Sequence, residues 1–310
     1  MIRKTLLYLS NQPRIFRFVR NNRLAKQFAS RFVAGETVAS ACDAVAALNK
    51  KGITASLDQL GESVSNEAEA RATAHGYLLL LDEIAKRKLD ANVSVKLTAL
   101  GQDIQDDLCA GNTREILERA KRYGSFVRLD MEGSAYTQRT LDFFAQRLYP
   151  DFPDTVGIVL QSALRRTPDD IEWAIGKQCR VRICKGAYLE PPAVAFPGKK
   201  DVDAAYVDAM KRLMQRGRYP GLATHDPAII AAATRLAKAE GIGADRFEFQ
   251  MLYGVRRDLQ EKLVRDGWRM RVYVPFGTQW YPYLMRRLAE RPANIAFITG
   301  NVMKELVSRR

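Results

Sequence analysis

Residues 180–190 read RVRICKGAYLE, and this stretch decides the fold. Its valine and isoleucine alternate with Arg182 and a cysteine, which is the period-2 pattern of a strand with one buried face. Lys185 and Gly186 then end the alternation. A cation in or beside a buried strand needs an anionic partner. The stretch therefore predicts a strand that runs into a binding loop, where a neighbouring carboxylate or a bound anion meets the two cations.

Strand-like runs occur seven more times along the chain, with helical segments between them. Eight strands alternating with helices in 310 residues predict one α/β unit, a (β/α)8 TIM-like barrel. An open doubly wound sheet is the alternative, but no GxGxxG turn follows the first run. The eight runs are ITASLD (53–58), VSVKL (93–97), FVRLDM (126–131), GIVLQ (157–161), VRICKG (181–186), GLATH (221–225), FEFQ (247–250) and RVYVPF (271–276). Helices are expected at 36–50, 67–88, 113–123, 136–147, 168–175, 202–216, 227–240, 256–266 and 282–289.

The net charge of +14 is concentrated at the N-terminus, where residues 1–35 contain no Asp or Glu. Apolar side chains interleave with the cations there, which is a basic amphipathic pattern. We expect a solvated helical face that covers the barrel. Contact with an anionic membrane surface is the second interpretation, and nucleic acid is not expected as a partner. We assign 1–50 to a basic helical segment packing on the barrel and 51–310 to the barrel itself.

Composition limits the class of protein further. No apolar run approaches the roughly 18 residues that a membrane span needs. The first residues lack the apolar segment and cleavage pattern of a signal peptide. Four cysteines without CxxC spacing are typical of reduced thiols in a cytoplasm. With only two histidines, no metal site is expected.

Polar side chains end most of the predicted strands. The chemistry of a barrel gathers at the carboxyl ends of its strands, so a ring of such residues predicts a polar ligand there. Lys96 alone is either a Schiff-base lysine or an ion-pair partner of Asp130. The ring consists of Asp58 with Glu62, Lys96, Asp130, Gln161, Arg182 with Lys185, Thr224 with His225, Gln250 and Tyr273.

The last predicted helix carries Tyr283, Arg286, Arg287 and Glu290 at positions i, i+3, i+4 and i+7, so the four share one face. A solvated, salt-bridged face is one interpretation. Adjacent arginines after the eighth strand also suit a forked clamp on a carboxylate or phosphate at the barrel mouth, which we favour.

Two other functions stay open from the residues alone. A Schiff-base aldolase would use Lys96 or Lys185 on the same barrel. A basic binding module for nucleic acid or anionic lipid would rest on the N-terminal charge.

Ordered motifs from LDQLGE onward resemble the flavin-dependent proline dehydrogenases, both monofunctional enzymes and the matching domain of bifunctional proline utilisation proteins. The motifs are LGE, SVKLTALG, RLDMEGS, VRICKGAYLE, ATHD, FEFQMLYG, RVYVPFGTQW and YLMRRLAERPANIAF.

The resemblance implies a distorted barrel with extra N-terminal helices that holds FAD non-covalently. It implies oxidation of L-proline to Δ1-pyrroline-5-carboxylate, the first step of proline catabolism to glutamate, with electrons passed to a membrane quinone. A pyrroline-5-carboxylate dehydrogenase is then the partner that takes the product. The expected location is the cytoplasm, with peripheral contact on the inner face of the cell membrane.

The resemblance also implies a role for each site residue. Asp130 lies under the substrate and Arg182 beside the reactive edge of the isoalloxazine, and these are the catalytic residues. The substrate residues are Lys96, Arg286 and Arg287 on the proline carboxylate, Tyr188, Leu252, Tyr273 and Tyr283 around its ring, and Glu62 as a gate paired with the first clamp arginine. The flavin contacts are Met131, Gln161, Arg182, Lys185, Gly186, Ala187, Tyr188, Thr224, His225, Gln250 and Glu290.

Two positions depart from the bifunctional relatives. Asp226 stands where they have an asparagine, and Leu189 stands where they have a tryptophan. Both are expected near the flavin, so they bear on its affinity and potential rather than on the reaction.

Overall fold

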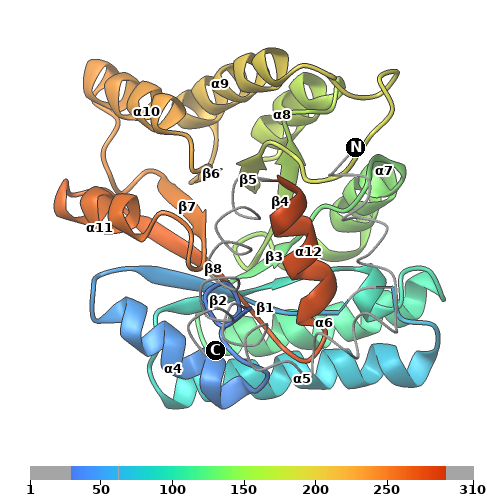
Figure 1. Ribbon diagram of the computed structural model, residues 1–310. Helices are drawn as coiled ribbons and strands as arrows, with labels where there is room; N and C mark the ends of the chain where they lie inside the picture. The colour runs from blue at the N-terminus through green and yellow to red at the C-terminus, as the bar shows by residue number, and fades with distance from the viewer. Residues whose placement is uncertain (1–28, 62, 291–310) are drawn as a thin grey trace, which may run out of the picture.

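Eight parallel strands pair in chain order, and the last closes on the first, so that the sheet forms a barrel (Figure 1). This computed structural model describes residues 29–61 and 63–290, with the backbone alone for 286–290. All eight predicted runs are strands, and the barrel rather than the doubly wound sheet is confirmed. At the seam, Thr54 lies beside Arg271. The strands are β1 (Thr54–Gln59), β2 (Ala91–Val95), β3 (Val127–Leu129), β4 (Val156–Gln161), β5 (Arg180–Cys184), β6 (Gly221–Ala223), β7 (Glu248–Leu252) and β8 (Met270–Phe276).

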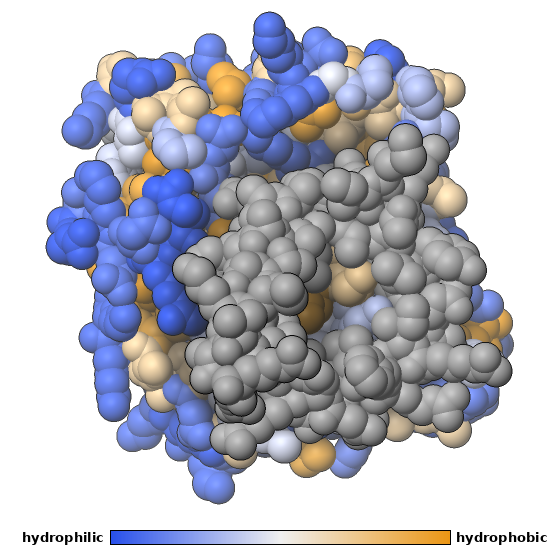
Figure 2. Space-filling view, in the orientation of Figure 1, coloured by the Kyte–Doolittle hydropathy of each residue, from blue (hydrophilic) through white to orange (hydrophobic). Residues whose placement is uncertain are grey.

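The helices that alternate with the strands lie around the outside of the barrel, whereas the last helix, α12, stands in front of it in the view of Figure 1. They are α4 (Val38–Asn49), α5 (Glu67–Lys86), the 3-10 turn η1 (Thr98–Leu100), α6 (Asp106–Arg122), α7 (Ser134–Phe143) with its π-helical continuation η2 (Phe144–Leu148), α8 (Thr167–Gly176), α9 (Lys199–Arg216), α10 (Pro227–Glu240), α11 (Arg257–Arg265) and α12 (Trp280–Glu290). The surface over α11, at the left of Figure 2, is mostly hydrophilic.

One helix differs clearly from its prediction. The helix expected at 113–123 already begins at Asp106. Gly111 and Asn112 are poor helix formers, and they hid this extension in the sequence. In the structure Asn112 is buried and donates a hydrogen bond to the Leu100 carbonyl at 3.0 Å. A tertiary contact thus outweighs the local propensity.

The apolar core lies between the strands and the surrounding helices, and polar side chains line the barrel interior. β4 is buried at all six residues, as expected of a parallel strand covered on both faces. Inside the barrel, the hydroxyl oxygens of Ser56 and Ser94 lie 2.9 Å apart. Arg182 on β5 reaches the same Ser94 on β2, a strand that β5 does not pair with. The interior is therefore narrow enough for side chains of non-adjacent strands to form hydrogen bonds across it.

Four charged residues near the amino ends of the strands form what we call the barrel floor: Arg128, Arg180, Glu248 and Arg271. Arg128 donates to the Arg180 carbonyl at 2.6 Å. Burial, reinforced by neighbouring arginines, holds the pKa of Arg128 well below its usual range. Gly157 leaves the room that Arg128 occupies, because an added Cβ would lie 2.7 Å from its Nη1.

Residues 29–36 form a strap over the carboxyl end of β8 and the start of α12. The Ala34 amide donates to the Pro275 carbonyl at 2.8 Å, and the Gly277 amide donates to the Gly35 carbonyl at 3.0 Å. Phe32 and its apolar neighbours pack against Trp280 and the following turn of α12. The strap thereby attaches the N-terminal side of the chain to the last described helix. Most of the basic segment predicted at the N-terminus lies outside the described residues.

Candidate active site

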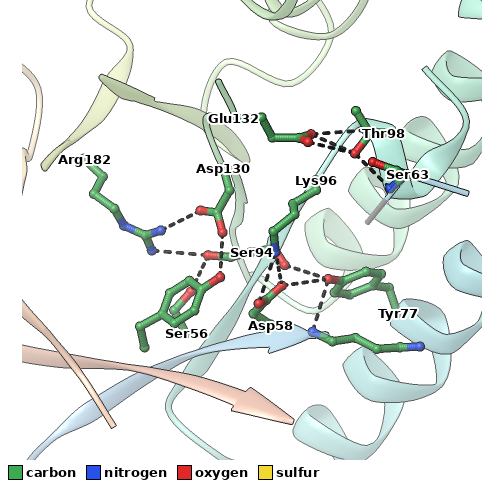
Figure 3. A network of polar contacts seen from close by, with 12 residues as sticks. Ser56, Asp58, Ser63, Tyr77, Ser94, Lys96, Thr98, Asp130, Glu132 and Arg182 are labelled. Atoms are coloured by element: carbon green, nitrogen blue, oxygen red, sulfur yellow. Dashed lines mark hydrogen bonds and ion pairs between the residues drawn. The ribbon is translucent and has the colours of Figure 1, made fainter. Parts of the chain in front are cut away.

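Asp130, after β3, and Arg182, on β5, meet at the carboxyl-terminal mouth of the barrel (Figure 3). Tyr273 on β8 reaches the same carboxylate. Arg182 Nη1 donates to Asp130 Oδ1 at 2.7 Å, and the Tyr273 hydroxyl donates to Asp130 Oδ2 at 2.7 Å. Burial, and next the Asp130 charge, raise the pKa of Tyr273 well above its usual range. Tyr273 is therefore a protonated donor at neutral pH, and the carboxylate is held by one partner on each oxygen.

The Arg182 guanidinium is fixed on every side. It is 6% exposed, and its charge lies 5.3 Å from the centre of the Tyr273 ring. Besides Asp130, its Nη2 donates to Ser94 Oγ at 3.2 Å and its Nε donates to Gln250 Oε1 at 2.5 Å. A cation held this way needs no reorganisation when negative charge develops nearby.

Lys96 pairs with Asp58 rather than with Asp130, which corrects the predicted Lys96–Asp130 ion pair. Lys96 Nζ donates to both Asp58 carboxylate oxygens, at 3.0 and 3.2 Å (Figure 3). The hydrogen bonds of the Asp130 carboxylate run to Arg182 and Tyr273 among the residues that the structure describes. Asp58 and Asp130 lie on the two neighbours of β2, and the carboxylate of Asp130 is already engaged by Arg182 and Tyr273.

Glu132 is a site residue that the sequence analysis missed. Its carboxylate accepts from the Thr98 hydroxyl at 2.9 Å, and Thr98 Oγ1 accepts from the Ser63 amide at 3.3 Å. The Glu132 carbonyl accepts from Gln161 Nε2 at 2.7 Å. Glu132 therefore ties the loop after β1 to the ends of β3 and β4. Its position two residues after Asp130, in the same strand-end motif, was the available signal.

Two carboxylates engage Lys185. Its Nζ lies 2.5 Å from Asp203 and 3.1 Å from Asp226, and Lys199 also pairs with Asp203. Burial is the largest single influence on the Asp226 carboxyl and raises its pKa, but the hydrogen bonds from Lys185 and the Ala228 amide and the charges of Lys185 and Lys199 together lower the net pKa. Asp226 also caps α10 by accepting from the Ala228 amide. Asp226, which departs from the bifunctional relatives, therefore stabilises α10 and pairs with Lys185, a predicted flavin contact.

The remaining predicted contacts follow β3, β5 and β6. His225 Nε2 accepts from the Leu252 amide at 2.9 Å, so the neutral ring carries its proton on Nδ1. Thr224 accepts from the Asp226 amide at 3.1 Å. Met131 is buried, Ala187 is half-buried, and Tyr188 is exposed.

Glu190 anchors the loop that follows β5 to the first residue of α7. It accepts from the Ser134 amide at 2.7 Å and also from the Ser134 hydroxyl. Tyr188 and Leu189 are exposed on this loop.

Tyr283 is buried on α12. Glu62 and the side chains of Arg286, Arg287 and Glu290 lie outside the described residues.

Sequence and structure comparisons decide the family. A family model described as proline dehydrogenase matches residues 41–300. The chain belongs to the proline dehydrogenase family. It is 40% identical over 307 residues to proline dehydrogenase 1 of Bacillus subtilis subsp. natto, which covers 98% of this chain and 100% of the relative. It is also 40% identical to the proline dehydrogenase of Deinococcus radiodurans, with 98% of each chain covered.

The proline dehydrogenase fold is likewise found in larger proteins. Proline utilization A of Bdellovibrio bacteriovorus, in a crystal structure inactivated by N-propargylglycine, superposes with a TM-score of 0.81 at 28% identity. The match covers 89% of this chain and 34% of that one. The chain thus spans about a third of the Bdellovibrio protein and the whole length of the Bacillus relative.

Within 29–61 and 63–290, no group of three or more His, Cys, Asp or Glu residues suits a metal ion. In the same ranges, no helix has the length and apolar character to cross a membrane.

Proposed function

We propose that the chain oxidises L-proline to Δ1-pyrroline-5-carboxylate with non-covalently bound FAD, as the first step of proline catabolism to glutamate. The observation that carries the proposal is the Arg182–Asp130–Tyr273 cluster, which holds a fixed cation and a fixed carboxylate at the mouth of a proline dehydrogenase barrel. Family membership makes proline the substrate class. The geometry supplies the charges that such a substrate and a flavin need.

The residues at the mouth fit a flavin. Gly186 has φ +105, and a Cβ added there would lie 2.8 Å from Gln161 Oε1, so glycine leaves the space that the Gln161 amide occupies. Amide, hydroxyl, imidazole and cationic groups lie at or just beyond the carboxyl ends of β4, β5 and β6: Gln161, Arg182, Lys185, Thr224 and His225. These are the donor types that hold the ring oxygens and nitrogens of a flavin. When bound, FAD would supply the two-electron acceptor for the oxidation.

The chain's own groups bind and orient the substrate. We propose that Lys96 with Arg286 and Arg287 holds the proline carboxylate, which fixes the ring carbon for transfer. Arg182 supplies permanent positive charge near the acceptor. Asp130 places its carboxylate beside the substrate, where it favours the positive charge of the developing imine.

The geometry opposes the Schiff-base alternative. A Schiff-base lysine must present an uncharged amine, with a lone pair, to a carbonyl. Lys96 is instead held against both oxygens of a buried carboxylate, and Lys185 is held between two carboxylates. Both amines are thereby engaged by carboxylates rather than presented to a carbonyl carbon.

We further propose a membrane quinone as the final electron acceptor and a pyrroline-5-carboxylate dehydrogenase as the enzyme that takes the product. A cytoplasmic location with peripheral contact on the inner membrane face goes with the quinone. The basic N-terminal charge supports that contact, because cations bind anionic lipid surfaces.

A visible absorption spectrum tests the proposal. We expect the purified, FAD-reconstituted protein to show an oxidised flavin spectrum that bleaches when L-proline is added without oxygen. D-proline is the control and should leave the spectrum unchanged. A protein that takes up no FAD contradicts the cofactor, and a flavin that L-proline leaves oxidised contradicts the substrate.

A further inference from the structure

The side chain of Gln250 has one fixed orientation. Its Oε1 accepts from Arg182 Nε at 2.5 Å, and its Nε2 donates to Glu248 Oε1 at 2.6 Å. A terminal amide can rotate by half a turn and exchange its donor and acceptor ends. Here Glu248 can only accept, so the oxygen of Gln250 must face Arg182. Glu248 and Gln250 are two residues apart on β7 and point to the same face.

Glu248 is itself anchored to the barrel floor. It is 4% exposed, and its Oε1 also accepts from Arg271 Nε at 2.7 Å. Its Oε2 accepts from the Tyr219 hydroxyl at 3.1 Å. Arg271 in turn donates to the Ala55 carbonyl at 2.7 Å, across the β1–β8 seam. The carboxylate therefore has little freedom to move.

Gly221 on β6 provides the space for this connection. β6 lies between β5, which carries Arg182, and β7, which carries Gln250. A Cβ added to Gly221 would overlap Gln250 Nε2. Any larger residue at 221 would therefore push the amide away from Arg182 or Glu248, while the backbone could stay in place.

We propose that Glu248 is a positioning residue that orients Arg182 through Gln250, so that the barrel floor sets the placement of the cation at the mouth. The expected change in kcat rests on the proposed function, because it is measured as proline oxidation. The structural consequence, the position of Arg182, does not depend on FAD or proline. Glu248 acts through its acceptor character, which keeps the amide of Gln250 from rotating.

The test compares Glu248→Gln with Tyr219→Phe. Glu248→Gln lets the amide of residue 250 rotate and face Arg182 with its NH2 group. Tyr219→Phe removes a hydrogen bond to the same carboxylate but leaves the Gln250 contact intact, so it is the matched control. Gly221→Ala disturbs the amide from the other side without touching Glu248, and it replaces Glu248→Gln should that variant not fold.

We expect Glu248→Gln and Gly221→Ala to lower kcat by about ten- to a hundredfold, since a misplaced catalytic group costs that much, and to make the flavin potential more negative. KM for proline should change less than kcat. Tyr219→Phe should lower the melting temperature and leave kcat and the potential close to wild type. Crystal structures should show the Arg182 guanidinium displaced in the first two variants only.

The proposal is overturned if the Glu248 and Gly221 variants match Tyr219→Phe in kcat, potential and Arg182 position, because Glu248 would then stabilise the fold and nothing more. A wild-type protein that fails to oxidise proline counts against the proposed function instead. In that case the crystal structures still decide whether Glu248 orients Arg182.

Discussion

Lys96 and Asp58 form a buried ion pair in which one ammonium contacts both carboxylate oxygens, at 3.0 and 3.2 Å. The side chain of Asp58 is 1% exposed and that of Lys96 is 11% exposed. The Tyr77 hydroxyl lies 3.5 Å from the same carboxylate. Asp58 therefore compensates the charge of a lysine that we assign to the substrate carboxylate, and it keeps that lysine at the mouth.

Removing one partner of this ion pair should lower the free energy of unfolding far more than removing both partners. We expect Lys96→Met to lower the free energy of unfolding by about 3–5 kcal/mol, because it leaves a buried carboxylate without its cation. The double variant Lys96→Met/Asp58→Asn should recover most of that loss. Urea unfolding of the two single variants and the double variant gives the coupling energy.

Losses that simply add in the double variant would show that the pair contributes little.

The strap of residues 29–36 should make an alanine substitution at Gly254 more destabilising than one at Gly241. Gly254 and Gly241 have φ values of 75° and 65°, so an alanine at either pays a similar backbone strain, on the order of 1 kcal/mol. A Cβ at Gly254 would also overlap the Arg31 carbonyl oxygen, whereas nothing lies within 4 Å of one at Gly241. Gly254→Ala should therefore lower the melting temperature clearly more than Gly241→Ala. Equal losses would mean that the strap does not press on Gly254.

The four cysteines should differ sharply in reactivity. Burial raises the pKa of Cys42 and Cys179 to about 11 and that of Cys109 to about 12, so these thiols carry almost no thiolate at pH 8. Cys184 is half-buried at the end of β5. We expect iodoacetamide to modify one thiol of the folded protein quickly and all four in urea. Cys184→Ser should abolish the fast reaction, and its persistence in that variant would contradict the assignment.

Asp226→Asn should strengthen FAD binding modestly. Asparagine still caps α10, but it removes one negative charge from Lys185, which then faces the flavin with less compensation. For a partly exposed pair the effect is about 0.5–1 kcal/mol, or roughly two- to fivefold in the dissociation constant. Fluorescence titration of the apoprotein with FAD measures it. Asp203→Asn is the comparison, because it removes the second carboxylate without changing a helix cap; weaker binding in both variants would contradict the charge argument.

The proposed clamp gives a prediction for the substrate. Arg286→Lys and Arg287→Lys should each raise KM for proline by about tenfold or more, since lysine cannot form the two parallel hydrogen bonds of a guanidinium. Steady-state kinetics with a fixed electron acceptor measures the effect. Wild-type kinetics in both variants would remove the clamp assignment.

The sequence predicted the strands better than the contacts between them. Runs of buried residues bounded by glycine identify parallel strands, so the barrel followed from residues such as those of β4. The partner of Lys96 did not follow, because Asp58 and Asp130 both end strands adjacent to β2, and periodicity does not choose between them. Glu132 and Glu248 were missed for a related reason: their roles depend on hydrogen bonds to residues far along the chain. The early start of α6 was hidden by Asn112, whose partner is likewise tertiary.

The seam between β1 and β8 also governs how the chain folds during synthesis. Thr54 pairs with Arg271, so the first and last strands of the barrel meet only when nearly the whole described chain is available. Until then β1 presents an unpaired edge, and the strap lacks the β8 carbonyl that Ala34 binds. A nascent chain that stops before β8 would therefore leave the β1 edge open, which favours aggregation until residue 276 has left the ribosome.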